Sequence, residues 1–277
     1  MGSSLFIKSK GFQEGYVSIA TPETAALRWI SLGRLGVTAS HSYSGHTGLT
    51  EEVVLTILSG QVTVETEGKV YEAIGRSDPF SDGPTLVCLP PNSAYSVKSL
   101  QPTADILVAQ APTSTPAADS LITPSAVPAR KVGASNWSRH VWPGSSLAAG
   151  TSRLLIGETV NPPGNWSSYP PHKHDTHNPP VEEVYEEVYF FSFKPRSGFG
   201  MQRLYERREG TDVLEEVFAV EDGDTVIIPR GYHPVVAAPG YQMSYVWILC
   251  GEGKSYGAWS DDPAHAWLRA VEPMFES

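Results

Sequence analysis

Short segments of alternating or continuous apolar residues recur along almost the whole chain, separated by Gly, Pro, Asn and Asp. Examples are EEVVLTILSG, QVTVETEG, TLVCLP, EEVYFFSF, DTVIIP and YQMSYVWILCG. Such segments, rich in Val, Ile, Tyr and Phe, are typical of antiparallel strands, and 23 prolines and 25 glycines mark the turns between them. Helical periodicity is sustained only in DPAHAWLRAVEPMF, residues 262–275. The pattern predicts an all-β fold of the barrel or sandwich class.

The two halves of the sequence resemble each other. EEVVLTILSG in the first half matches EEVYFFSF in the second, and DGPTLVCLPPNSAY matches DGDTVIIPRGYH. Between the halves, residues 111–131 are rich in Pro, Ser, Thr and Ala and poor in aromatic residues, as a connector would be. We therefore expect two similar tandem domains, residues 1–118 and 119–277.

Charge and hydropathy exclude two classes of partner. A formal charge of −10 at pH 7 opposes binding to a nucleic-acid backbone, which requires clustered Lys and Arg. No apolar run approaches the roughly 18 residues needed to cross a bilayer, and MGSSLFIKSKGFQEG lacks the apolar core of a secretory signal. We therefore expect a cytoplasmic protein with no nucleic-acid or membrane partner, in which Cys88 and Cys250 are free, buried thiols.

Three of the eight histidines cluster in the stretch GNWSSYPPHKHDTHNPP. On a strand, His172 and His174 would project from the same face, as paired metal ligands do, while Lys173 points away. Glu187, at the start of EVYFF, and His233, in PRGYHP, offer two more ligands. Three imidazoles and one carboxylate can hold Zn, Mn, Fe or Ni with positions left for substrate. We expect one divalent ion per chain, zinc first among these.

Several residues near this segment leave alternatives open. A His-x-His pair on its own is more often a surface feature than a ligand set. Glu182 and Glu183 are rival carboxylates, although a strand position fixes Glu187 better than a loop would fix either of them. His177 could be a fifth contact, but a loop histidine is more simply a surface residue.

The N-terminal half repeats the strands without the ligands. Glu52 remains in EEVV, but His41 has no partner two residues away, and PPNSAY places Ala94 or Tyr95 where a histidine is needed. We therefore expect no metal in the first domain, which would instead serve packing, assembly or the shape of the pocket.

The predicted ligands resemble the two motifs of the cupin superfamily. The matching residues are Gly164, His172, His174 and Glu187 in the first motif and Gly223, Pro229, Gly231 and His233 in the second. Twelve residues separate His174 from Glu187, where cupins have only a few, which implies an inserted loop, DTHNPPVEEVYE. His233 also lies one position closer to its glycine than in the common pattern. The resemblance implies a bicupin, with two tandem antiparallel β-barrel or jelly-roll domains.

The C-terminal half is more specifically similar to the 5-deoxy-glucuronate isomerase family. The segments that carry the likeness are GNWSSYPPHKHD, PPVEEVYEEVYFFSFKP, GFGMQRLY, DGDTVIIPRGYHPVVAAPGY and DPAHAW. The likeness is strong from about residue 150 to 270 and looser before that. It implies a bicupin of myo-inositol catabolism that converts 5-deoxy-D-glucuronate to 5-dehydro-2-deoxy-D-gluconate, an aldose–ketose isomerisation.

The predicted site suits this chemistry. A divalent ion can stabilise an enediolate by binding both oxygens, and a positioned group must then move the proton. We expect Tyr189, on the same strand face as Glu187, and Gln202, on the next strand, to be catalytic. Arg203 and Arg230 are candidates to bind the substrate carboxylate, and Tyr169 is a further substrate-binding candidate. Either arginine could instead be a surface or interface charge, and Tyr189 a core aromatic.

Two other functions are compatible with the same scaffold. A bicupin dioxygenase would hold iron or copper in an apolar pocket, and a non-catalytic sugar-acid-binding cupin would hold a structural ion. In each case the expected partner is a small molecule. Because cupin relatives commonly assemble, we also expect a homo-oligomer, a dimer or higher.

Overall fold

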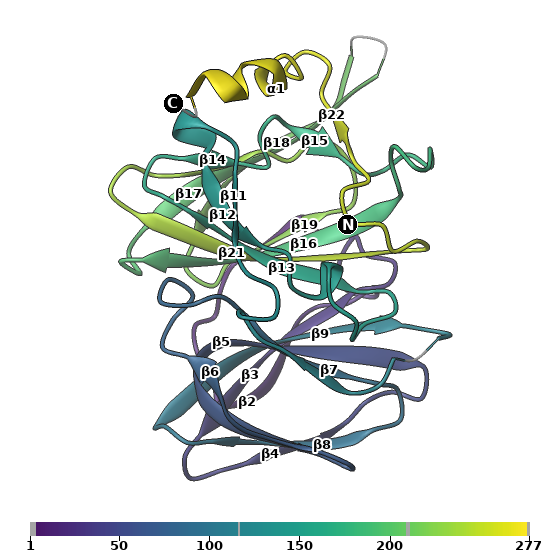
Figure 1. Cartoon of the computed structure of the whole chain (residues 1–277), viewed down its shortest axis with the longest axis vertical. Helices are drawn as coiled ribbons and strands as arrows, with labels where there is room; N and C mark the ends of the chain where they lie inside the picture. Colours follow the sequence, from purple (N-terminus) through teal and green to yellow (C-terminus); the bar gives the residue numbers. More distant parts are fainter. Residues whose placement is uncertain (1–3, 116, 209–210, 276–277) are drawn as a thin grey trace.

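The computed structural model describes residues 4–115, 117–208 and 211–275, and strands dominate it. Figure 1 shows two stacked systems of strands, one from each half of the chain. No helix in these ranges is long and apolar enough to span a membrane. The mostly-β prediction is confirmed.

One nine-stranded sheet makes up the N-terminal half. Its main path runs β10-β7-β5-β9-β3-β2, and β4, β6 and β8 join it at the side through the long strand β5. The strands are β2 (Gly15–Ala20), β3 (Ser31–Thr38), β4 (Tyr43–His46), β5 (Glu51–Thr66), β6 (Val70–Arg76), β7 (Thr85–Leu89), β8 (Ala94–Ser99), β9 (Thr103–Pro112) and β10 (Ser120–Ile122).

Three sheets make up the C-terminal half. The seven-stranded sheet runs β1 (Phe6–Ile7), β19 (Thr225–Ile228), β16 (Tyr185–Lys194), β21 (Gln242–Gly251), β13 (Leu155–Asn161), β12 (Arg139–Trp142), β11 (Arg130–Val132). The four-stranded sheet runs β14 (Trp166–Ser167), β20 (Val235–Ala237), β17 (Phe199–Arg208), β18 (Thr211–Glu221), and the two-stranded sheet pairs β15 (His172–Lys173) with β22 (Ser260–Asp261).

The two halves repeat one strand order and exchange their edge strands. The order β7-β5-β9-β3 in the first half corresponds to β19-β16-β21-β13 in the second. At the edge of each set lies a short strand from the opposite half, since β1 pairs with β19 and β10 pairs with β7. No single cut of the chain therefore separates the two strand systems.

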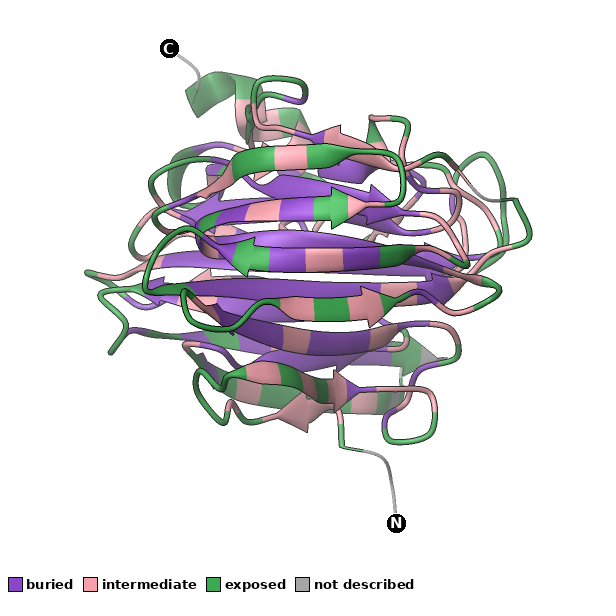
Figure 2. Cartoon of the chain, turned by 90° about the horizontal axis from the view of Figure 1, so that it is seen from below, coloured by how far each residue is buried: buried purple, intermediate pink, exposed green. Residues whose placement is uncertain are grey.

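The apolar core lies in three layers, one inside each half and one between them. The layer between the halves combines residues such as Leu32, Val54 and Leu86 with Val188 and Ile248. Figure 2 shows that buried residues concentrate in the strands of the middle layers. The central strands are buried on both faces, which is why their sequences are apolar almost without interruption.

Two buried carboxylates join the halves in matching ways. Glu52 accepts hydrogen bonds from the backbone N–H groups of residues 152–154, at 2.6, 2.9 and 2.7 Å. Glu186 accepts them from residues 28–30, at 2.5, 2.8 and 2.7 Å. Each half therefore uses a strand-borne glutamate to satisfy backbone donors of the other.

The predicted C-terminal helix is much shorter than its sequence pattern suggested. Only α1 (Leu268–Val271) is α-helical, and the 3-10 turn η3 (Glu272–Phe275) follows it. Asp262, whose side chain accepts hydrogen bonds from the Tyr205 hydroxyl and the Ala264 N–H, holds the preceding residues in a turn. Pro273 lacks the N–H needed to continue an α-helix. Two further 3-10 turns are η1 (Ser135–Trp137) and η2 (Gly144–Ser146).

Candidate metal centre

Strand β16 delivers polar side chains into a cavity of the C-terminal half. Successive residues of a strand face opposite sides, so Tyr185, Glu187 and Tyr189 line the cavity, whereas Glu186 and Val188 face the N-terminal half. Other walls come from β11, β12, β13, β21 and residues 255–259. The volume of about 270 Å³ is near the lower end of ordinary small-molecule sites, roughly 300–1,000 Å³.

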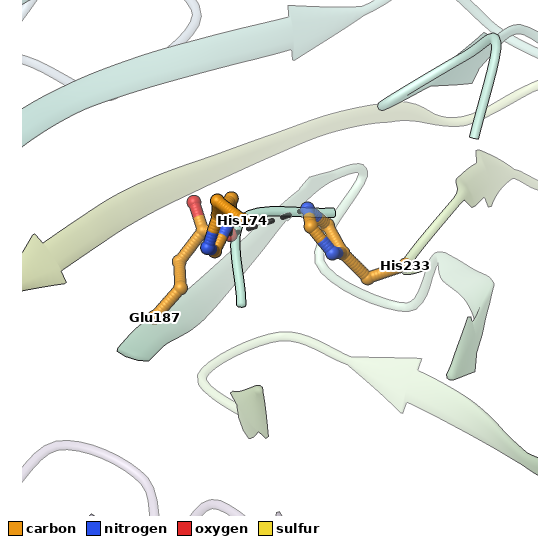
Figure 3. Close-up of side chains that lie close together, drawn as sticks. All are labelled: His174, Glu187 and His233. Atoms are coloured by element: carbon orange, nitrogen blue, oxygen red, sulfur yellow. Dashed lines mark hydrogen bonds and ion pairs between the residues drawn. The ribbon is translucent and has the colours of Figure 1, made fainter. Parts of the chain in front are cut away.

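Three of the four predicted metal ligands converge beside this cavity. His174 Nε2 lies 3.0 Å from Glu187 Oε2, and His233 Nε2 lies 3.3 Å from the same oxygen. One ligand atom from each of the three residues falls within 4.8 Å of the others. Figure 3 shows the two imidazoles and the carboxylate drawn together from separate segments of the chain. All three side chains are buried.

The hydrogen bonds behind the histidines orient them for a cation. His174 Nδ1 donates to the carbonyl of Tyr185 at 3.0 Å, and His233 Nδ1 donates to that of Gly231 at 2.9 Å. A carbonyl oxygen can only accept, so each neutral ring carries its proton on Nδ1 and a lone pair on Nε2. Two lone pairs and a carboxylate oxygen then face one small buried space. This donor set fits a divalent ion of the Zn, Mn, Fe or Ni type.

His172 lies next to this group without completing it. Its ring centroid is 4.7 Å from that of His233 and 5.2 Å from that of Trp259, and the residue pairs with Asp261 across β15 and β22. Its buried Nδ1 has no hydrogen-bond partner within the described ranges. The ring borders the cavity, and its role as a fourth ligand stays a prediction.

The electrostatics keep two of the three histidines uncharged. Burial lowers the pKa of His172 well below 6.5, assisted by the neighbouring His233 and His174, and burial lowers the pKa of His233 to about 4. Burial also acts to lower the pKa of His174, but the hydrogen bond to Glu187, the charge of Glu187 and the backbone hydrogen bonds together outweigh it, and the pKa is raised. A proton and a metal ion would therefore compete for the space between His174 and Glu187.

The inserted loop is held by its own carboxylate rather than by the site. Glu182 Oε1 accepts hydrogen bonds from Lys173 Nζ at 2.8 Å and from the N–H groups of Asp175 and Thr176 at 2.9 Å each. Of the rival carboxylates, Glu182 is thus used to shape the loop. His177 is exposed, with its Nδ1 3.6 Å from Glu183 Oε2.

The two arginines predicted to hold the substrate carboxylate do not line the cavity. Arg203 forms a two-point ion pair with Glu215, at 2.7 Å for both contacts. Arg230 pairs with Glu206 at 2.8 Å, and its side chain is 48% exposed. Both turn toward other carboxylates, and the arginines that do line the cavity are Arg130 and Arg139.

Gln202 and Tyr169 also lie outside the cavity lining. Gln202 is fully buried on β17, opposite Val235, and neither atom of its amide has a hydrogen-bond partner in the described part of the chain. The ring of Tyr169 packs against Trp166 and His265. Only its backbone carbonyl approaches the cavity wall, by accepting a hydrogen bond from Arg139.

Sequence reasoning missed part of the cavity lining. Tyr245, Trp247 and Leu249 face the cavity from β21, and their period of two in YVWILCG was a usable signal. Trp259 and Arg139 gave no comparable signal, because short strands and long-range pairing bring them to the site.

The described residues of the N-terminal half form no equivalent centre. Strand pairing places Val53 opposite Leu89 and Glu187 opposite Ile228, so Val53 occupies the position of Glu187. The sequence suggested that Glu52 is the counterpart of the ligand Glu187. The strand pairing shows instead that Glu52 corresponds to Glu186. The residues described for this half contain no group of three metal-ligand side chains.

Comparison with known proteins identifies the family. A model of the KduI/IolB family matches residues 5–268. The chain belongs to the KduI/IolB family. A similar protein named 5-deoxy-glucuronate isomerase, from Geobacillus thermodenitrificans (strain NG80-2), is 35% identical over 258 residues, covering 92% of each chain. Another of that name, from Shouchella clausii (strain KSM-K16), is 32% identical over 268 residues, covering 94% of this chain and 96% of the relative.

Solved structures agree with membership of the KduI/IolB family. An IolB-like protein from Salmonella typhimurium LT2 superposes with a TM-score of 0.87 at 26% identity, covering 96% of this chain and 99% of the other. Oxalate decarboxylase from Lactobacillus farciminis gives a TM-score of 0.67 at 12% identity, covering 92% and 88%. The second likeness is one of fold alone.

Proposed function

We propose that this protein is a metal-dependent isomerase that converts 5-deoxy-D-glucuronate to 5-dehydro-2-deoxy-D-gluconate in myo-inositol catabolism. The observation that carries the proposal is the buried His174–Glu187–His233 group beside a cavity, in a chain whose similar relatives bear the isomerase name. The reaction moves a hydrogen from C2 to C1 of a hydroxy-aldehyde, so it needs a polarised carbonyl and a route for one proton.

The ligand set supports the first need. A divalent ion held by His174, Glu187, His233 and His172 would polarise the aldehyde and the adjacent hydroxyl. Zinc is our first choice, with Mn, Fe or Ni as alternatives, because the mixed nitrogen and oxygen donors discriminate poorly among them. The apolar and aromatic walls of the cavity would exclude bulk water from the reacting carbons.

Tyr189 is the candidate for stabilising the enediolate. Its hydroxyl is 2.8 Å from Ser168 Oγ, and burial together with the charge of Glu187 raises its pKa well above 10. It therefore keeps its proton and would donate a hydrogen bond to an enediolate oxygen rather than act as a base. Gln202 lies outside the cavity lining, so it would contribute to catalysis indirectly, by positioning His233. Its strand β17 pairs with β20, the strand that follows His233.

We also propose that the chain forms two cupin domains divided near residue 118, apart from the exchanged edge strands β1 and β10, with the ion only in the second domain. The repeated strand order supports this division. The small sugar acid would be the partner, the location the cytoplasm, and the assembly a homo-oligomer of two or more subunits. Sedimentation velocity tests the last point, and a monomer at micromolar concentration would refute it.

The test of the activity is direct. Zinc-loaded protein is incubated with 5-deoxy-D-glucuronate in D₂O, and ketone formation and deuterium at C1 of the product are followed by NMR. We expect conversion of the substrate with solvent deuterium at C1 of the product. A chelator should abolish the conversion, and one equivalent of zinc per chain should restore it. No conversion by loaded protein refutes the isomerase. Binding without conversion would favour a sugar-acid-binding cupin, and oxygen consumption a dioxygenase.

A further inference from the structure

Arg139 is a buried cation in the wall of the cavity. It lies at the start of β12, is 7% exposed, and lines the same cavity as His172, His174 and Glu187. Its charge contributes to lowering the pKa of His172, which places the guanidinium within electrostatic range of the metal centre.

No carboxylate of the described chain forms an ion pair with Arg139. Glu272 is close enough to influence its pKa, but that carboxylate is engaged by the Trp137 indole N–H at 3.2 Å and by Arg269 at 3.6 Å. Burial lowers the pKa of Arg139, which reflects the cost of holding a charge away from water. A fold that keeps such a charge beside a cavity is prepared for an anion.

The hydrogen bonds of Arg139 leave one edge of its guanidinium for a ligand. Nη1 donates to the carbonyls of Trp137 and Tyr169, at 3.1 Å each. Within the described residues, Nε and Nη2 have no acceptor. This edge can donate two parallel hydrogen bonds to one carboxylate, and the two carbonyl contacts hold it in place before a ligand arrives.

A second arginine lies on the same face of the neighbouring strand. Across β11 and β12, Arg130 pairs with Val141 and Val132 pairs with Arg139. All four residues line the cavity. Arg130 is exposed and lies on the solvent side of the cavity wall, whereas Arg139 is buried. The hairpin therefore presents two positive charges to the cavity of a protein whose net charge is −10.

We propose that Arg139 binds the carboxylate of the substrate through its Nε and Nη2 edge, with Arg130 attracting the anion at the entrance. The inference rests on the proposed isomerase and adds its substrate rule: an aldose must carry a carboxylate at the end opposite its aldehyde. Arg139 is then a specificity-determining residue, in the place that the sequence had suggested for Arg203 or Arg230.

The experiment compares two substrates that differ only at C6. The first is 5-deoxy-D-glucuronate, and the second is its neutral counterpart, 5-deoxy-D-glucose, which has a hydroxymethyl group in place of the carboxylate. The variants are Arg139→Met, Arg139→Lys and Arg130→Met, and Arg196→Met is the control because this exposed arginine pairs with Asp222 away from the cavity. Thermal melting and ion content show that each variant is folded and loaded.

Wild type should prefer the acid, and Arg139→Met should lower kcat/KM for the acid about a hundredfold or more, mainly through KM. The same variant should leave kcat/KM for the neutral sugar within a few fold. Arg139→Lys should recover part of the loss, Arg130→Met should raise KM for the acid a few fold at low salt only, and Arg196→Met should change nothing.

The outcomes separate the two proposals. If wild type converts neither sugar, the isomerase itself is wrong. If wild type is active and Arg139→Met loses the acid and the neutral sugar equally, Arg139 only supports the structure and the carboxylate inference is overturned. Should Arg139→Met fail to fold, the acid-to-neutral ratio of Arg139→Lys decides, and an unaltered ratio with an unaltered KM refutes the two-point contact.

Discussion

Replacing Glu186 with glutamine should loosen the contact between the halves and spare the metal centre, whereas the same change at Glu187 should do the reverse. The two residues are neighbours on β16 but face opposite sides of it. Glu186 Oε1 accepts from the N–H groups of Trp29 and Ile30, and Oε2 accepts from Arg28. A glutamine can keep the first two hydrogen bonds, but its NH₂ group would face the N–H of Arg28.

The expected cost follows from that geometry. One hydrogen bond to a charged acceptor is lost, worth about 1.5–3 kcal/mol, and the two that remain become bonds to a neutral oxygen. Relief of the buried charge offsets part of this, since burial raises the pKa of Glu186 despite the three N–H groups. We expect a net loss of about 2 kcal/mol in the free energy of unfolding, and a fall in Tm of roughly 4–8 °C.

The assay measures Tm by circular dichroism and ion content by elemental analysis for both variants. Melting in a chelator removes any contribution of the ion to stability. Glu186→Gln should melt earlier and keep its ion, and Glu187→Gln should lose its ion. If Glu186→Gln loses the ion at an unchanged Tm, the alternation of β16 assigned above is wrong.

Three further outcomes are expected. His174→Ala should lose the bound ion, because only the imidazoles of His172 and His233 then remain beside the Glu187 carboxylate. An unchanged ion content would reject the ligand assignment. Tyr189→Phe should keep its ion but lower kcat by about a hundredfold, and a normal kcat would show that this hydroxyl does not stabilise the enediolate. Burial raises the pKa of the Cys88 and Cys250 thiols from 9.0 to about 12, so neither should react with iodoacetamide at pH 8 until the chain unfolds. Because these pKa values are raised, the stability they contribute is complete below about pH 9 and falls by about 1.4 kcal/mol per pH unit and thiol as pH rises toward 12. Labelling of the folded protein, or an identical pH slope in a double alanine variant, would contradict this.

The sequence predicted the candidate metal centre because the residues of that centre follow local rules. The spacing of His172 and His174 and the strand position of Glu187 can each be read within a few residues, and three of the four predicted ligands meet. The inserted loop did not mislead the prediction, because the pleat of β16 decides which glutamate faces inward.

The residues that line the rest of the cavity could not be predicted in the same way. Gln202 and Arg203 are adjacent on β17, so they face opposite sides of the strand and cannot both point inward. Arg139 reaches the cavity through pairing of β12 with β13 and β11, which no local pattern encodes. The correspondence of Glu52 with Glu186, and not with Glu187, is likewise set by strand register. A one-residue offset between the two repeats cannot be seen without the strand pairing.

The exchange of edge strands bears on how this chain is made. The segment that leaves the ribosome early, β1, finds its partner β19 only when almost the entire polypeptide has emerged. The C-terminal half thus cannot complete its seven-stranded sheet until β19 has been synthesised. Such an arrangement makes the synthesis of β19 a condition for completing the C-terminal sheet, so a product truncated before residue 225 would carry an unfinished sheet edge.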